Sequence, residues 1–170
     1  MKEYIPLPGS TKEKILSSAL ETFTKQRFED TNIHEIAKNA NVTTGAIYHH
    51  FGSKSKLLDI IKREVEQRIV DRMEGVIELF DTPFEKIEAA LKTGLDFVIK
   101  KDMANLFTDS LSLEANKVYL FIEDLCGETK INGLGPVIYS AWISIVDSII
   151  NRRLTIEEGK NLLSWLVKKN

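Results

Sequence analysis

Apolar residues recur at helical spacing along almost the whole chain, and this periodicity restricts the fold to a helical one. The prolines, Pro6, Pro8, Pro83 and Pro136, lie either before an expected helix or at the start of one. No segment alternates apolar and polar residues for long enough to indicate a β-strand. We therefore expect an all-α protein.

Length and composition indicate a globular, cytoplasmic protein. The chain has 170 residues, of which 43% are hydrophobic and 28% charged, enough for one substantial core or two small ones that share a long helix. Its apolar runs are interrupted well before the roughly 18 residues that a membrane-spanning helix needs, and residues 1–6 do not resemble a secretory signal. The single cysteine, Cys126, excludes an intramolecular disulfide and a cysteine-based metal cluster. We expect no cofactor, no metal and no membrane partner.

Charge is divided unevenly along the chain. Residues 10–63 hold nine Lys or Arg against six Asp or Glu, which gives +3, and all three histidines lie there. Residues 64–170 hold thirteen Lys or Arg against eighteen Asp or Glu, which gives −5. A basic head on an acidic body is typical of a protein whose head alone meets a polyanion, although many helical proteins show such a difference by chance.

Capping residues mark the expected helix starts. The first three helices begin after Ser10, Asn32 and Thr43, whose side chains can accept hydrogen bonds from free backbone amides. Gly52 suits the left-handed position past the end of the third helix, and Ser53 caps a long fourth one. Further on, Pro83 opens a fifth helix, and Pro136 and Thr155 start the last two, at about 136–152 and 155–168. Residues 126–135, which contain three glycines, are expected to form a loop.

Residues 32–52 have the pattern of a helix-turn-helix, with a tight turn at Asn41, a residue type that tolerates the left-handed conformation. Val42, Ile47 and Phe51 anchor the second helix, so that its polar side can enter the major groove of DNA. Small residues there allow close approach, and hydroxyl and imidazole groups can reach phosphates or base edges. The polar side consists of Thr43, Thr44, Gly45, Tyr48 and His49.

This segment and its flanks resemble the signature of the TetR family of regulators. The resemblance covers about residues 10–62 and rests on the run ANVTTGAIYHHFGSKSKLL at 40–58 and on KILSSALETF at 14–23. Many members of that family have glycine where this chain has Arg27 and Asn41. Arg27 leaves the end of the first helix open and adds a basic group near the DNA side.

The resemblance implies a role for each matching residue. Tyr48, His50 and Lys54 match positions that commonly contact phosphates, and His34 matches a position that can reach a base. His49 matches a position where the family often has an aromatic residue that contacts a base or the DNA backbone. The full set of DNA-binding residues that the resemblance implies is His34, Thr43, Thr44, Gly45, Tyr48, His49, His50 and Lys54.

The last two expected helices carry more apolar surface than a helix packed on one side requires. Because the TetR family builds an intersubunit four-helix bundle from its last two helices, we expect a homodimer. Such a dimer presents two recognition helices and would bind a pseudo-palindromic operator in double-stranded DNA. The predicted interface residues are Trp142, Ile145, Ile149, Leu163 and Leu166.

Aromatic side chains are scattered over the expected helices between residues 80 and 121. They would line an apolar cavity if packing were incomplete and would form an ordinary core if it were complete. The resemblance favours a pocket for a small apolar effector. The predicted lining residues are Phe80, Phe84, Phe97, Phe107, Tyr119 and Phe121.

We therefore expect a helix-turn-helix DNA-binding domain at 1–52, joined by the fourth helix to a helical regulatory and dimerisation domain at 53–170. The predicted function is sequence-specific transcriptional regulation by a repressor that a small-molecule effector releases from DNA. A ligand-independent DNA-binding protein and a protein-interaction module of the same fold are the alternatives. The chain carries no phosphate loop, zinc-protease motif or nucleophile elbow, so we do not expect an enzyme.

Overall fold

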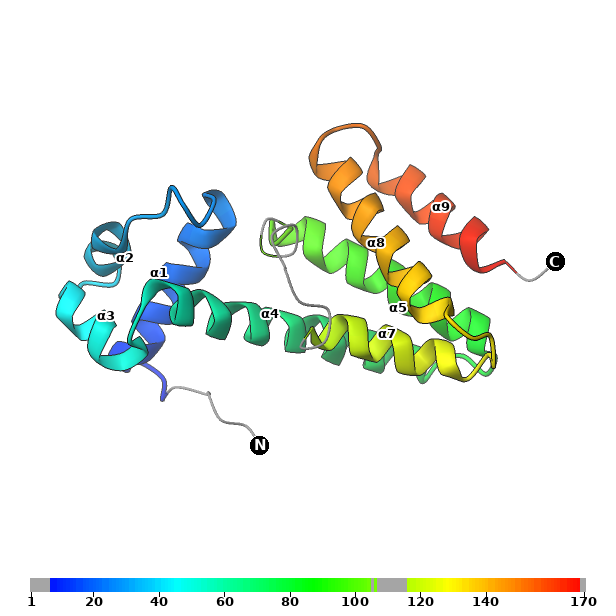
Figure 1. Ribbon diagram of the computed structural model, residues 1–170, viewed down its shortest axis with the longest axis horizontal. Coiled ribbons are helices and arrows are strands. Elements are labelled where there is room, and N and C mark those ends of the chain that lie inside the picture. Colours follow the sequence, from blue (N-terminus) through cyan, green and yellow to red (C-terminus); the bar gives the residue numbers. More distant parts are fainter. Residues whose placement is uncertain (1–6, 105, 107–115, 169–170) are drawn as a thin grey trace. The chain divides into compact units, whose positions relative to one another are not determined.

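The computed structural model of the protein describes residues 7–104, 106 and 116–168. Within these residues every regular element is a helix, as the sequence predicts (Figure 1). No helix in this part of the chain combines the length and apolarity needed to cross a membrane. The helices are α1 (Thr11–Lys25), α2 (Ile33–Asn39), α3 (Thr44–Phe51), α4 (Lys54–Ile77), α5 (Pro83–Lys100), α7 (Lys117–Gly127), α8 (Leu134–Ile150) and α9 (Ile156–Val167).

Backbone contacts divide the chain into two compact units, Met1–Lys62 and Arg63–Asn170. The division falls inside α4, so that one continuous helix contributes its first residues to the first unit and the remainder to the second. The two units therefore have separate cores although their backbones share a helix.

The first unit consists of α1, α2, α3 and the start of α4. All of the predicted capping residues in it are used: Ser10, Asn32, Thr43 and Ser53 each accept a hydrogen bond from a backbone amide within the first turn of the helix that follows. A buried hydrogen bond from Ser18 Oγ to a carbonyl oxygen of α2, 3.0 Å long, ties α1 to α2. The core of this unit is formed by Ile15, Ala19, Phe23, Ile36, Ile47, Phe51, Leu57 and Ile61.

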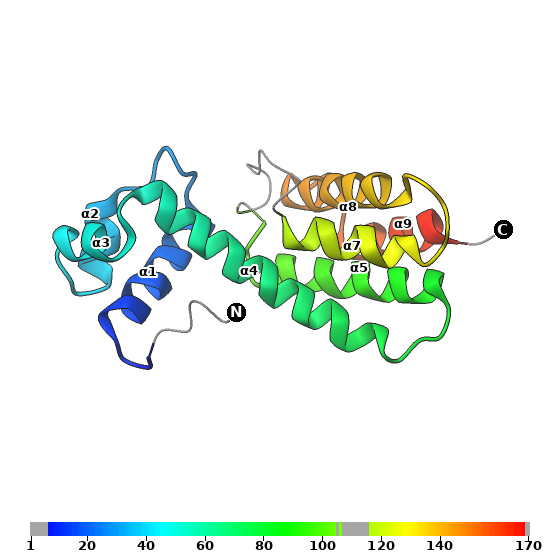
Figure 2. The same ribbon diagram turned by 60° about the horizontal axis from the view of Figure 1, so that its bottom comes forward.

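The second unit contains the later part of α4 with α5, α7, α8 and α9. Figure 2 shows α7 beside α8, and α5 also packs against α9. Trp142 of α8 lies at the centre, fully buried, and its Nε1 donates to the carbonyl of Leu91 at 3.0 Å. Gly94 of α5 leaves room for it, because a Cβ there would lie 3.3 Å from the indole and 2.1 Å from Cε of Met73. A large residue on α8 and the absence of a side chain on α5 thus fit each other.

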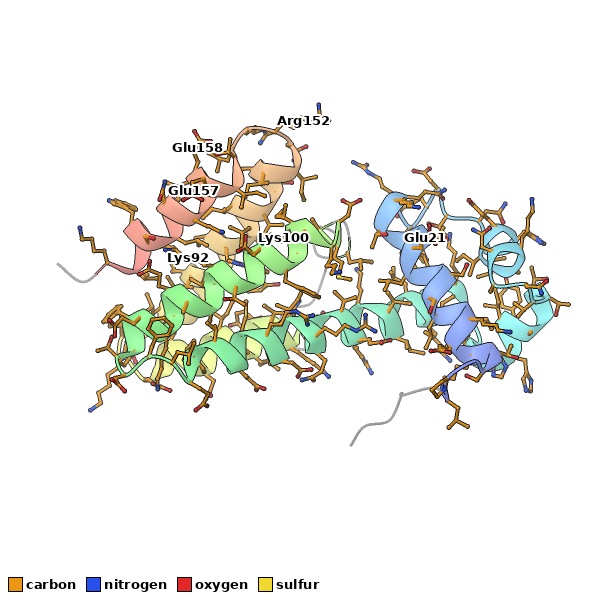
Figure 3. All side chains as sticks on the ribbon, turned by 180° about the vertical axis from the view of Figure 1, so that it is seen from behind. Glu21, Lys92, Lys100, Arg152, Glu157 and Glu158 are labelled. Carbon is orange, nitrogen blue, oxygen red and sulfur yellow. The ribbon has the colours of Figure 1, made fainter. Side chains whose placement is uncertain are left out.

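Polar side chains flank the contact between α5 and α9. Glu88 accepts hydrogen bonds from Lys92 at 2.6 Å and from Ser164 of α9 at 2.8 Å, and the hydrogen bond from Lys92 lowers the pKa of the Glu88 carboxyl. Asp96 pairs with Lys160 of α9 at 2.9 Å. Figure 3 shows Lys92 and Lys100 on α5, and Glu157 and Glu158 at the start of α9. Glu158 completes the capping box with Thr155 that its spacing predicts.

The segment between α7 and α8 is shorter than expected. Cys126 and Gly127 belong to α7, and α8 begins at Leu134, two residues before the predicted start at Pro136. Pro136 can lie inside the first turn of α8 because the amides of a first helical turn have no partner within the helix, so that a proline there loses no hydrogen bond. Burial raises the pKa of the Cys126 thiol to about 11, which keeps it protonated at neutral pH.

Several turns use left-handed backbone without glycine. Asn41, Asp102, Lys130 and Arg152 all have φ between 54° and 60°. Each lies just past the end of a helix, where a left-handed residue reverses the chain. Asn41 and Asp102 are of types that tolerate this conformation, whereas Lys130 and Arg152 are not.

Burial corrects part of the predicted dimer interface. Trp142 and Leu163 are fully buried inside a single chain and therefore have no surface left to bury against a partner. Ile145 is 8% exposed, and Ile149 and Leu166 are half-buried. The large apolar side chains that α8 and α9 do expose are Val137, Ile150, Leu162 and Trp165.

The aromatic residues predicted to line a pocket have different surroundings. Phe97 is buried under the guanidinium of Arg72, which lies 3.9 Å from the ring centroid, whereas Phe80 is 37% exposed. Tyr119 contacts Tyr139 edge-on, and burial raises the pKa of Tyr139 to about 12. Phe84, Tyr119 and Phe121 are half-buried, and Phe107 lies outside the described residues. The pocket stays a prediction.

The close crossing of α7 and α8 predicts the effect of one substitution. A Cβ on Gly135 would lie 2.8 Å from Cα of Glu123, and this contact is with backbone that cannot turn aside. Gly135→Ala should lower the free energy of unfolding by about 1–3 kcal/mol. Urea unfolding followed by tryptophan fluorescence measures this, since both tryptophans belong to the second unit.

Gly75 is the matched control, because it is exposed inside α4 and a Cβ there would meet nothing within 4 Å. Gly75→Ala should raise stability by about 0.5–1 kcal/mol through its effect on backbone entropy. If Gly135→Ala were as stable as the wild type, the described crossing of α7 and α8 would be wrong.

Candidate DNA-binding site

The turn between α2 and α3 has a fixed backbone. Asn41 adopts the left-handed conformation, with φ of 54°, as predicted. The amide of Val42 then donates to the carbonyl of Ala37 at 2.9 Å, which folds the chain back against the end of α2. Thr43 follows at once as the cap of α3, its Oγ1 accepting from the amide of Ala46 at 3.1 Å. Turn and cap together set where α3 begins and in which direction it runs.

One side of α3 is buried and the other is exposed. Ile47 and Phe51 are inserted into the core of the first unit, with 0% and 4% exposure. Around the rest of the helix, Thr43, Gly45, Tyr48, His49 and His50 are exposed, and Thr44 is half-buried. Six of the predicted DNA-binding residues therefore lie on α3 or at its cap, and five of the six are exposed.

The backbone in the first turn of α3 is accessible. A Cβ on Gly45 would meet only the Thr43 hydroxyl, at 3.7 Å, so the site is open on its outer side. At the other end of α3, the ring of His50 lies 5.4 Å from that of His49 and 6.1 Å from that of Phe51. Free amides at the helix start carry a partial positive charge, which favours an anion there.

The two remaining predicted residues lie on other helices. His34 is exposed in the first turn of α2, which begins where Asn32 Oδ1 accepts from the His34 amide at 2.9 Å. Lys54 is the first residue of α4. Within the described residues, no group of three or more His, Cys, Asp or Glu could hold a metal ion.

Lys54 has contacts inside the protein that the sequence did not indicate. Its Nζ donates to the carbonyl oxygens of Phe28 at 2.6 Å and of Thr31 at 2.9 Å, and it lies 4.3 Å from the centroid of the Phe28 ring. Phe28 and Thr31 belong to the connection between α1 and α2, more than twenty positions away in the chain. The signals in the sequence that could have indicated these contacts of Lys54 are weak: an aromatic residue, Phe28, after the first helix and a threonine, Thr31, before the Asn32 cap.

The chain is similar to known bacterial regulatory proteins. Residues 15–61 match the family model of bacterial regulatory proteins of the tetR family. LmrA of Bacillus subtilis, an HTH-type transcriptional regulator, is 28% identical over 145 residues, which are 82% of this chain and 70% of LmrA. HbdR of Aromatoleum sp., an HTH-type transcriptional regulator, is 32% identical over 127 residues, which are 71% of this chain but only 52% of HbdR.

The likeness extends to the whole fold. The crystal structure of the transcriptional regulator FadR from Bacillus subtilis, in complex with stearoyl-CoA, superposes with a TM-score of 0.73 at 19% identity. The match covers 92% of this chain and 97% of FadR. The chain belongs to the tetR family of bacterial regulatory proteins, and it is a DNA-binding transcriptional regulator of the helix-turn-helix type.

Proposed function

We propose that the protein is a dimeric repressor that binds a pseudo-palindromic operator through α3 and leaves it when a small apolar effector binds. The observation that carries this proposal is the exposed polar surface of α3 on a capped, fixed turn, inside the part of the chain that matches the family model. Residues 1–52 would bind DNA, and residues 53–170 would dimerise and bind the effector. The protein would act in the cytoplasm, and we propose no enzymatic activity for it.

The first turn of α3 is suited to the major groove. Thr43, Thr44 and Gly45 are small, so the backbone can approach base edges closely. The phenol of Tyr48, which is 48% exposed, and the imidazole of His50 can donate to phosphates. His34 and His49 are placed on exposed helix surfaces from which they can reach bases.

Substitutions on α3 should separate sequence recognition from general affinity. Thr44→Ala and His49→Ala should change the sequence that the protein selects from a random pool of duplexes. Tyr48→Phe removes a hydroxyl that can donate to phosphate, so it should weaken binding to every duplex by about ten-fold. Lys130→Ala, an exposed change in the second unit, is the control and should alter neither property. Equal effects of all three α3 variants on all sequences would contradict these roles.

A second copy of this chain is the proposed partner of the exposed side chains on α9. Leu162 and Trp165 are 41% and 74% exposed and stand three positions apart, so they lie on the same face of the helix. Val137 and Ile150 add exposed apolar surface on α8. Apolar surface of this kind is commonly covered by another subunit.

Charge on α9 should prevent dimerisation. Trp165→Lys should yield a monomer in sedimentation equilibrium, because an ammonium would have to be buried in an apolar interface. The same variant should retain its helical circular dichroism and lose affinity for a palindromic duplex. Leu120→Lys provides the control, since Leu120 is 46% exposed on α7 and lies outside the proposed interface. A dimeric Trp165→Lys variant would exclude this surface as the interface.

Continuity of α4 supports release by an effector. The helix begins with Lys54 in the first unit and ends with Ile77 in the second, so a displacement of its later part changes where its start lies. Stearoyl-CoA is the first probe to use, because the similarly folded FadR binds it.

Titration with stearoyl-CoA, and then with shorter acyl-CoAs and free fatty acids, should weaken the binding of a selected duplex while the dimer persists. If no probe changes DNA affinity, a ligand-independent DNA-binding protein is favoured. If the wild type shows no salt-sensitive DNA binding at all, a protein-interaction module is favoured.

A further inference from the structure

The ammonium of Lys54 is engaged inside the first unit. Two carbonyl oxygens, of Phe28 and Thr31, accept its hydrogen bonds at 2.6 and 2.9 Å, and the Phe28 ring lies beneath it at 4.3 Å. An ammonium has three N–H groups, so two of them are used by the protein itself. Charge-assisted hydrogen bonds are stronger than neutral ones, and the half-buried site strengthens them further.

These contacts join two points that border the helix-turn-helix. Thr31 immediately precedes Asn32, the cap of α2, and it is only 4% exposed. Its own hydroxyl donates to the carbonyl of Arg27 at 2.9 Å, so the connection is ordered around it. Lys54 follows the end of α3 by three residues. One side chain therefore links the start of α2 to the end of α3 by a route separate from the turn at Asn41.

We propose that Lys54, Phe28 and Thr31 form a clamp that positions α3 for DNA, with Lys54 acting as a positioning residue through these contacts. This proposal rests on the proposed function, since it concerns the same DNA-binding surface. The clamp matters because only two side chains of α3 itself, Ile47 and Phe51, are buried. Helix–turn–helix units held by so few contacts need their neighbours to fix the angle between the two helices.

The substitution Lys54→Met tests the clamp, because it keeps the length of the side chain and removes the ammonium. DNA affinity is measured with a duplex enriched by the wild type and with a random-sequence duplex, over a series of salt concentrations. We expect binding of the enriched duplex to weaken about ten-fold or more. If Lys54 acts through its carbonyl contacts, the slope of log affinity against log salt should change no more in this variant than in the charge control Lys56→Met. Hydrogen exchange of amides in α2 and α3 should become faster, while that in α7 and α8 stays the same.

Lys56→Met is the matched control for charge. Lys56 is exposed in the same turn of α4, so the variant shows what the loss of one positive charge does to the salt dependence. Phe28→Leu tests the contact between the ammonium and the aromatic ring, since it removes the ring and leaves Lys54 in place. Because residues of one network are coupled, Phe28→Leu combined with Lys54→Met should weaken binding by much less than the product of the two single effects.

Two results would overturn the proposal. A salt slope lowered by about 0.9 in Lys54→Met, with unchanged exchange in α2 and α3, would show a phosphate contact. Faster exchange with unchanged affinity of the folded variant would show a role in stability alone. Failure of the wild type to bind any duplex in a salt-dependent manner would instead refute the proposed function, and the exchange rates would then still decide whether the clamp holds α2 and α3.

Discussion

The position of α3 depends on interactions at its ends more than on its own packing. A helix of eight residues that buries two side chains is short compared with what isolated helices need to be stable in water. The left-handed Asn41, the Thr43 cap and the carbonyl contacts of Lys54 each fix a different part of its surroundings. Because of this arrangement, the exposed residues of α3, to which we assign the DNA contacts in our proposal, are not needed to hold the helix in place.

The second unit obtains its order in another way. Its core is built on side-chain volume, with Trp142 and Met73 opposite the bare backbone of Gly94. The polar pairs of α5 with α9, such as Asp96 with Lys160, are half-buried at the edge of that packing and connect the two helices.

Features that depend on neighbouring residues in the chain could be predicted from the sequence. The caps at Ser10, Asn32, Thr43 and Thr155 involve atoms a few positions apart, and the turn at Asn41 follows from a property of asparagine itself. Features that depend on distant residues could not be predicted in this way. An apolar tryptophan on a helix is equally suited to a core and to an interface, and Trp142 belongs to the core because distant residues such as Gly94 leave room for it there. The clamp on Lys54 requires knowing that the connection after α1 returns to the start of α4.

The left-handed residues at helix ends have a consequence for how this sequence can diverge. Lys130 and Arg152 occupy a conformation that is unfavourable for such side chains by roughly 1 kcal/mol compared with glycine. The fold tolerates both of them, so it remains folded without the most stable residue at each corner. A change to glycine at either of these corners would offset a modest loss of stability elsewhere. Stability lost by exchanging residues on α3 could therefore be recovered at corners that are distant from α3 in the chain.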